Sequence, residues 1–188
     1  MRKLVLMASV GGLLVVALGG GSLAFGGDNR SGGTSANLIG YNEVPSVSTV
    51  AHGQFRATID GDDGEIHYKL SYEGIEGAAT VAAHIHLGQS HTNGGVSAFL
   101  CGGGDKPACP AKTATIEGTI DATDVIGPAS QGILAGELAE LVRGIRAGAT
   151  YANVHSSTFP GGEIRGQLKG RGDLFDHHGK RGHDGGDD

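Results

Sequence analysis

Alternation of apolar and polar residues is the dominant pattern along this chain, and it is clearest in residues 49–60 and 65–72. Every second residue is apolar there, as in the run FRATI that begins at Phe55. Because side chains in a strand point alternately to its two faces, both segments are predicted to be strands with one buried side. Residues 61–64 (Gly-Asp-Asp-Gly) have the composition of a turn, so the two strands are expected to form a hairpin.

Five further segments show strand alternation, and one segment has helical spacing instead. Strands are expected at residues 80–87, 96–100, 113–120, 151–155 and 163–168. A helix is expected at residues 133–147, which carry Leu134, Leu138, Leu141, Val142 and Ile145 on one face and are followed by Gly148 as a stop. Many short strands with one helix in a connection predict a mainly β fold, an antiparallel β-sandwich or barrel.

Three histidines are the candidates for a functional site in this fold. His84 and His86 are two residues apart on one expected strand, so their imidazoles project from the same face. His155 ends another expected strand, and if the two strands lie close together the three rings converge. Imidazoles bind copper and zinc, and three of them leave a coordination position open. These residues are therefore candidate ligands of a mononuclear copper or zinc ion, with His91 and Glu163 as weaker candidates.

The same residues are also compatible with a purely structural role. In that interpretation the three histidines and Asn153 hydrogen-bond the backbone at the ends of strands, and Glu163 and Arg165 form an ion pair on the surface. An H-x-H pair on a strand is common, so the sequence leaves both interpretations open.

The two ends of the chain differ in composition from the strands between them. Two basic residues precede a long uncharged apolar run with small residues at 22 and 24, so residues 1–24 are expected to be a cleaved signal peptide. The alternative is an uncleaved membrane anchor. In either case the protein is expected to be exported, outside the cell or in its envelope. Residues 25–34 are expected to be a flexible linker, 35–169 one β domain, and 170–188 a disordered tail rich in Gly, Asp and His.

The cysteines and the charge balance restrict the chemistry further. Cys101 and Cys109 enclose a short glycine-rich loop, and in an exported protein this spacing predicts a local disulfide rather than a thiolate metal site. The formal net charge is −6, without the basic stripe that nucleic acids require. The chain also lacks a Gly-x-Ser-x-Gly motif, so a serine hydrolase has no nucleophile elbow here.

The chain contains three sequence motifs that occur in the same order in one known protein family. Residues 36–45 (ANLIGYNEVP), 82–88 (AAHIHLG), 151–155 (YANVH) and 160–168 (PGGEIRGQL) carry them. They resemble the opening, central and closing motifs of the chordin-domain (CHRD) family. The resemblance implies an immunoglobulin-like β-barrel in a secreted or surface protein. It implies no settled activity for single-domain members, because function is a property of sites rather than of folds.

These observations favour a binding or structural module over an enzyme. Such a module would meet an unidentified protein or cell-surface polymer, would not bind nucleic acid, and would contact a membrane only through an uncleaved N-terminal segment. A second class is a metal-binding protein that uses His84, His86 and His155. The third is a copper or zinc redox enzyme similar to copper–zinc superoxide dismutase, for which residues 89–105 supply only His91 and Asp105 as additional ligands.

Overall fold

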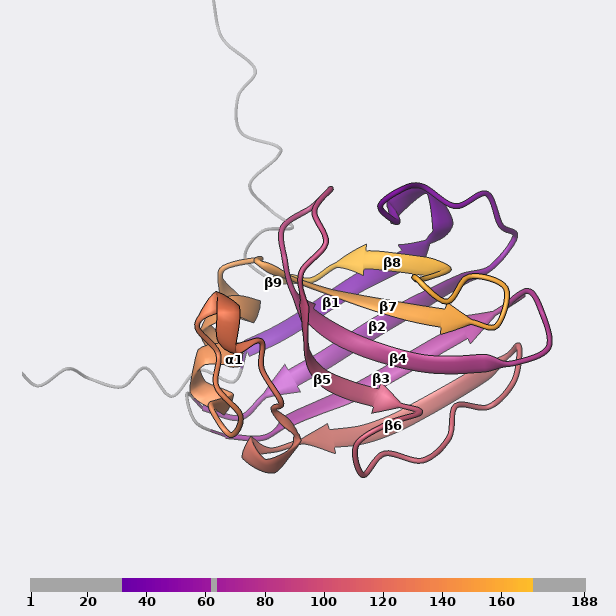
Figure 1. Cartoon of the computed structure of the whole chain (residues 1–188). Helices are drawn as coiled ribbons and strands as arrows, with labels where there is room; N and C mark the ends of the chain where they lie inside the picture. The colour runs from indigo at the N-terminus through magenta and orange to yellow at the C-terminus, as the bar shows by residue number, and fades with distance from the viewer. Residues whose placement is uncertain (1–31, 62–63, 171–188) are drawn as a thin grey trace, which may run out of the picture.

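A computed structural model describes residues 32–61 and 64–170, which form one curved antiparallel sheet with a single α-helix (Figure 1). The strands are β1 (Gly32–Ile39), β2 (His52–Ile59), β3 (Ile66–Glu73), β4 (Thr80–Leu87), β5 (Gly95–Cys101), β6 (Ala114–Ile120), β7 (Thr150–Ser156), β8 (Ile164–Gln167) and β9 (Lys169–Gly170). The helices are α1 (Leu138–Arg146) and three short 3-10 turns, η1 (Gly40–Asn42), η2 (Ala122–Asp124) and η3 (Ala129–Gln131).

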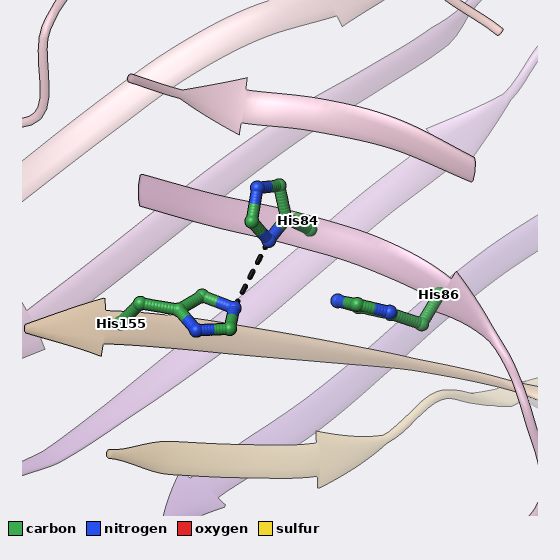
Figure 2. A group of neighbouring side chains, drawn as sticks. All are labelled: His84, His86 and His155. Atoms are coloured by element: carbon green, nitrogen blue, oxygen red, sulfur yellow. Dashed lines mark hydrogen bonds between the residues drawn. The ribbon is translucent and has the colours of Figure 1, made fainter. Parts of the chain in front are cut away.

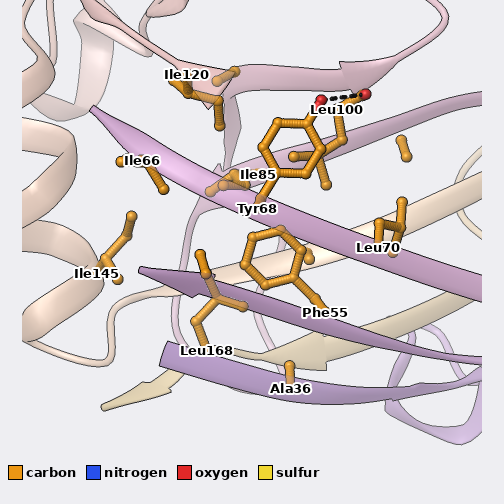
Figure 3. Close-up of a cluster of buried hydrophobic side chains, with 14 of the residues drawn as sticks. Ala36, Phe55, Ile66, Tyr68, Leu70, Ile85, Leu100, Ile120, Ile145 and Leu168 are labelled. Atoms are coloured by element: carbon orange, nitrogen blue, oxygen red, sulfur yellow. Dashed lines mark hydrogen bonds between the residues drawn. The ribbon is translucent and has the colours of Figure 1, made fainter. Parts of the chain in front are cut away.

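The sheet curls into a nearly closed barrel. Its strand order is β5-β4-β7-β8-β1-β2-β3-β6, and β9 pairs with β1 beside that path. The two ends of the path approach each other, since the Tyr68 hydroxyl on β3, the neighbour of the last strand β6, donates a hydrogen bond of 2.7 Å to the carbonyl of Leu100 on the first strand β5 (Figure 3). The predicted fold class is confirmed: the described chain is mainly β, antiparallel and barrel-like, with one helix in a connection.

Alternating side chains fill the barrel, as the sequence pattern predicts. The predicted hairpin is present, with Ile59 opposite Ile66, and its apolar residues point inward. Figure 3 shows Phe55, Tyr68, Leu70 and Ile85 gathered in this interior. Each of these four side chains is at most 5% exposed. Burying apolar side chains in this way contributes about 1.5–3 kcal/mol each to folding, before the conformational entropy that opposes it.

The helix is shorter than predicted. It was expected at residues 133–147, but α1 begins only at Leu138. The reason is local: Gly132 and Gly136 adopt left-handed backbone angles (φ 93° and 88°), which a continuous right-handed helix excludes. The end of the helix agrees with the prediction, because Gly148 is left-handed with φ 65°. The buried stripe of α1 packs at one end of the barrel, where Figure 3 shows Ile145 facing the core.

Strand β4 departs from simple alternation at its beginning. Strict alternation along β4 would place Val81 on the inner face with Ala83, Ile85 and Leu87, but Val81 is 44% exposed. A bulge between Thr80 and Ala82 shifts the register against β7, and the extra residue turns Val81 outward. From Ala83 onward one face of β4 points into the barrel. The opposite face of β4, β7 and β8, which carries His84, His86, Asn153, His155 and Arg165, is called the outer face below.

Two predictions concern the covalent and membrane properties of the chain. The disulfide between Cys101 and Cys109 is present, as predicted. Within the described ranges the structure has no helix that is both long and apolar enough to cross a membrane. The expected signal peptide (1–24), residues 25–31 of the expected linker, part of the hairpin turn (62–63) and all but the first residue of the expected tail (170–188) lie outside the described residues. β1 begins at Gly32, so the last residues of the expected linker belong to a strand.

Candidate metal centre

The outer face brings His84, His86 and His155 together, and these three residues are called the histidine cluster here. β4 and β7 are neighbours in the sheet, with Asn153 opposite His84 and His155 opposite Ala82. One ring nitrogen from each histidine can be chosen so that all three lie within 4.8 Å of one another. Figure 2 shows the rings of His84 and His86, from β4, facing the ring of His155 on β7.

Backbone carbonyls determine which nitrogen of each ring is available. His86 Nδ1 lies 3.0 Å from the carbonyl oxygen of Gly94, and His155 Nδ1 lies 3.0 Å from that of Pro160. A carbonyl oxygen can only accept, so both Nδ1 atoms carry the proton in the neutral ring. The Nε2 atoms of His86 and His155 therefore present lone pairs. In protein metal sites, ligand histidines are commonly oriented by this kind of hydrogen bond from the second ring nitrogen.

A hydrogen bond joins the remaining histidine, His84, to His155. His84 Nδ1 lies 3.0 Å from His155 Nε2 (Figure 2). Because Nε2 of His155 presents a lone pair, neutral His84 donates its Nδ1–H to it. A metal ion between the rings would replace this proton, with His84 moving its hydrogen to Nε2. His86 Nε2 is buried and has no partner that meets hydrogen-bond geometry in the described structure. The Asn153 side chain is near enough to this ring to raise its pKa, but burial lowers the pKa more strongly.

Burial keeps all three imidazoles uncharged at neutral pH. His84, His86 and His155 are 9%, 7% and 8% exposed. Loss of hydration lowers the pKa of His84 to about 3, helped by the neighbouring histidines. It lowers the pKa of His86 to about 4 and also lowers the pKa of His155. A metal ion needs neutral imidazole, so the ligand nitrogens are free of competing protons over the physiological range.

A buried carboxyl group acts on the cluster through Asn153. The Asn153 amide lies 3.0 Å from His155 Nε2 and also hydrogen-bonds Glu43. The hydrogen bond from Asn153 lowers the pKa of Glu43, but burial outweighs it and raises this pKa to about 7. Asn153 therefore links the histidine cluster to a buried carboxyl group that changes its protonation near neutral pH.

Aromatic side chains pack around the rings. Phe99 on β5 meets His84 edge-on, with ring centroids 4.6 Å apart. Tyr151 stacks on His86 at 4.7 Å with an interplanar angle of 3°. The Arg165 guanidinium carbon lies 3.4 Å from the centre of the Tyr151 ring. Because β7 lies between β4 and β8, His86 and Arg165 approach Tyr151 from opposite sides. This packing restricts the rotamers of both β4 histidines.

The donor set fits a small transition-metal ion. Metal–imidazole bonds of about 2.0–2.1 Å place ligand nitrogens roughly 3.3–3.6 Å apart in a trigonal or tetrahedral site. In the structure one pair is 3.0 Å apart and all three nitrogens lie within 4.8 Å, so shifts of about 1 Å would complete the coordination. Three neutral nitrogens suit copper or zinc and leave one position open.

The weaker sequence candidates do not join the cluster. The Glu163 carboxylate is fully buried elsewhere, where it accepts hydrogen bonds from the Thr49 hydroxyl at 2.8 Å and the Glu76 amide at 2.9 Å. His91 is exposed in the loop after β4. The expected surface ion pair is wrong as well, because Glu163 and Arg165 are 0% and 2% exposed and form no ion pair with each other in the described structure.

Sequence reasoning missed three residues that shape the site. Glu43 lies in the loop after β1, and nothing in the local pattern indicates that this loop reaches the outer face. Phe99 and Tyr151 read as ordinary strand residues. Their positions opposite His84 and His86 become visible only once the pairing of β5, β4 and β7 is known. A second cluster of three or more ligating side chains, as a bimetallic centre requires, is absent from residues 32–61 and 64–170.

A family comparison agrees with this architecture. The model of the CHRD domain matches residues 34–168, which is most of the chain and contains the whole histidine cluster. The chain therefore belongs to the CHRD domain family. Comparisons with curated proteins and with solved structures find no match.

Proposed function

We propose that this protein is an exported binding module of the CHRD type that holds one copper ion at His84, His86 and His155. The observation that carries the proposal is His86 Nε2, a buried lone pair with no hydrogen-bond partner that faces two other imidazoles. Leaving a buried polar atom unpaired costs about 1–3 kcal/mol. Metal coordination would offset that cost, whereas a purely structural role for His86 gives no reason for it.

Copper is favoured over zinc by the ligand chemistry. At a given nitrogen site the affinity of divalent first-row metals rises to copper and falls again at zinc. Three histidines with an open fourth position also occur in catalytic zinc sites, so the choice of copper rests on this order of affinities. The role is binding rather than turnover. The partner that such a module meets outside the cell would be a protein or a surface polymer.

The test is a competition titration of copper against a chromophoric chelator, with the full chain in which the tail histidines His177, His178 and His183 are replaced by alanine. One copper ion per chain is expected. His86→Ala and His155→Ala should each weaken binding by about 100-fold or more. The matched controls are His52→Ala and His67→Ala, which remove exposed histidines from β2 and β3 and should change the affinity less than about twofold.

Two results would overturn this proposal. Copper bound equally well by the wild type and by the folded His86→Ala and His155→Ala variants would remove the site. Zinc retained against the chelator under conditions in which copper is not would reject the choice of metal. Circular dichroism of each variant separates loss of ligand from loss of fold.

A further inference from the structure

A cavity of about 360 Å³ lies beside β1 and β8, next to the loop that follows β4. It is lined by Arg165, Lys169, His91 and by the polar side chains of Asn42, Ser90 and Gln167. No carboxylate is among its lining residues, although the chain as a whole carries a formal net charge of −6. A cleft with cations and no acidic group is therefore a local reversal of the overall charge.

Arg165 is the unusual residue in this lining. Its side chain is 2% exposed, yet no carboxylate of residues 32–61 or 64–170 lies within ion-pair distance of it. The Glu43 carboxyl attracts it only from a longer range. A buried guanidinium without a paired anion is costly, and buried charges in proteins are normally paired.

The hydrogen bonds of Arg165 leave capacity for a ligand. Its Nη2 donates to the carbonyl oxygens of Gln89 at 3.0 Å and Thr92 at 2.7 Å, and Nη1 donates to Asn93 Oδ1 at 3.4 Å. A guanidinium has five N–H groups, so two remain without a protein acceptor in the described structure. The carbonyl oxygens and the face of the Tyr151 ring attract the guanidinium but carry no formal negative charge to neutralise it.

A lysine and a histidine border the same cavity. Lys169 on β9 is exposed and has no ion pair within the described ranges. His91 has a left-handed backbone with φ 65°, a conformation uncommon for residues other than glycine. We infer that this cavity, which is separate from the histidine cluster, binds a small oxyanion, the carboxylate or phosphate group of a ligand, through Arg165, Lys169 and His91. This inference does not depend on the proposed copper site.

The experiment is a titration of the full chain at constant ionic strength, with three probes: inorganic phosphate, acetate and, as an uncharged analogue, acetamide. Binding is followed by amide chemical shifts. Saturable shifts at Ser90, His91, Gln167 and Lys169 are expected with phosphate or acetate and none with acetamide. The stronger of the two anions identifies a phosphoryl or a carboxylate ligand.

A matched pair of lysine variants tests the position of the site. Lys169→Ala should weaken anion binding by about fivefold, because one cation at the cavity is lost. Lys69→Ala, which removes a lysine paired with Glu117 on the far strands, should change it less than about twofold. His91→Ala gives a second measurement that leaves Arg165 in place, and Arg165→Gln should abolish binding if that variant folds.

The inference would be overturned by either of two outcomes. One is an equal effect of Lys69→Ala and Lys169→Ala, which would indicate only non-specific charge screening. The other is the absence of saturable shifts at the cavity residues with both anions, in a sample whose spectrum shows the native fold.

Discussion

The two faces of β4 and β7 are both buried, but their chemistry differs. The inner face carries Ala83, Ile85 and Val154, which are fully buried in the apolar barrel. The outer face carries the histidine cluster, which is covered by loops and aromatic rings and keeps an unpartnered ring nitrogen. Apolar burial on the inner face stabilises the barrel, whereas polar burial on the outer face opposes stability and sustains reactive lone pairs. Residues that adjoin in sequence thus contribute separately to stability and to the proposed metal binding.

The largest expected effect comes from a substitution that disrupts the packing of the inner face. Ile85→Ala removes a fully buried side chain between two cluster residues and should lower the free energy of unfolding by about 2–5 kcal/mol. Copper affinity of the remaining folded protein should change less than about threefold, because the side chain points away from the cluster. Urea unfolding at pH 7.5 and the chelator competition measure the two quantities. A large loss of affinity in folded Ile85→Ala would show that the faces are not separable.

The next effect concerns the outer face and is a loss of stability at acidic pH. Unfolded histidine takes a proton near pH 6.5, whereas burial holds the pKa of His84 at about 3 and that of His86 at about 4. Below pH 6.5 the unfolded chain therefore binds more protons, and stability falls as the pH decreases. Each of these two histidines should cost about 2 kcal/mol between pH 7.5 and pH 5 in the metal-free protein.

His86→Leu isolates this effect. It removes one titrating group and one unpaired polar atom, so its stability relative to the wild type should rise by about 2 kcal/mol when the pH is lowered from 7.5 to 5. The matched control is His52→Leu, which makes the same substitution at an exposed histidine of β2. Identical pH profiles for His86→Leu and the wild type would contradict the burial of a neutral imidazole at this position.

Glu43 should titrate in the opposite direction. Burial raises its pKa from 4.5 to about 7, so the folded protein takes up its proton at a higher pH than the unfolded chain does. Its contribution to stability is fully present below about pH 4.5 and is lost as the pH rises through 7. Glu43→Gln should therefore be more stable than the wild type at pH 8, by about 3 kcal/mol, and similar to it at pH 4.5.

Urea unfolding at the two pH values measures this difference. The control is Glu65→Gln, which removes an exposed carboxylate from the start of the hairpin and should show no such divergence. A Glu43→Gln variant that is less stable than the wild type at pH 8 would mean that the fold stabilises the Glu43 carboxylate, so that burial does not raise its pKa.

The sequence pattern predicts the inner face better than the outer one. Period-two alternation identifies Phe55, Tyr68 and Ile85 as core because burial in a barrel is a local property of each strand. The convergence of His84, His86 and His155 could also be anticipated, since H-x-H fixes one face and only one strand pairing had to be assumed. The helix start was misplaced because helical spacing of leucines does not reveal that Gly136 is left-handed.

The supporting residues could not be found this way, because they depend on contacts between distant segments. Glu43 reaches Asn153 across 110 positions of sequence, and Glu163 turns to Thr49 rather than to the histidines. The local sequence around an acidic residue beside a strand does not show which distant side chain it will contact. The contacts on the outer face depend on the paths of the loops and on cross-strand neighbours, which are properties of the folded barrel.

The smallest expected effect tests whether the outer face is organised around His155 Nε2. Asn153→Leu keeps a side chain of similar size but removes the amide that hydrogen-bonds this nitrogen and Glu43. The ring would keep its bond to the Pro160 carbonyl and lose its second restraint, so copper affinity should fall by about tenfold, near 1.4 kcal/mol. The control is Asn93→Leu, whose amide contacts Arg165 and the Val44 carbonyl rather than the cluster. Equal losses in the two variants would assign the effect to general loosening of the loops, whereas a loss confined to Asn153→Leu would show that second-sphere hydrogen bonding adjusts the site without contributing a ligand.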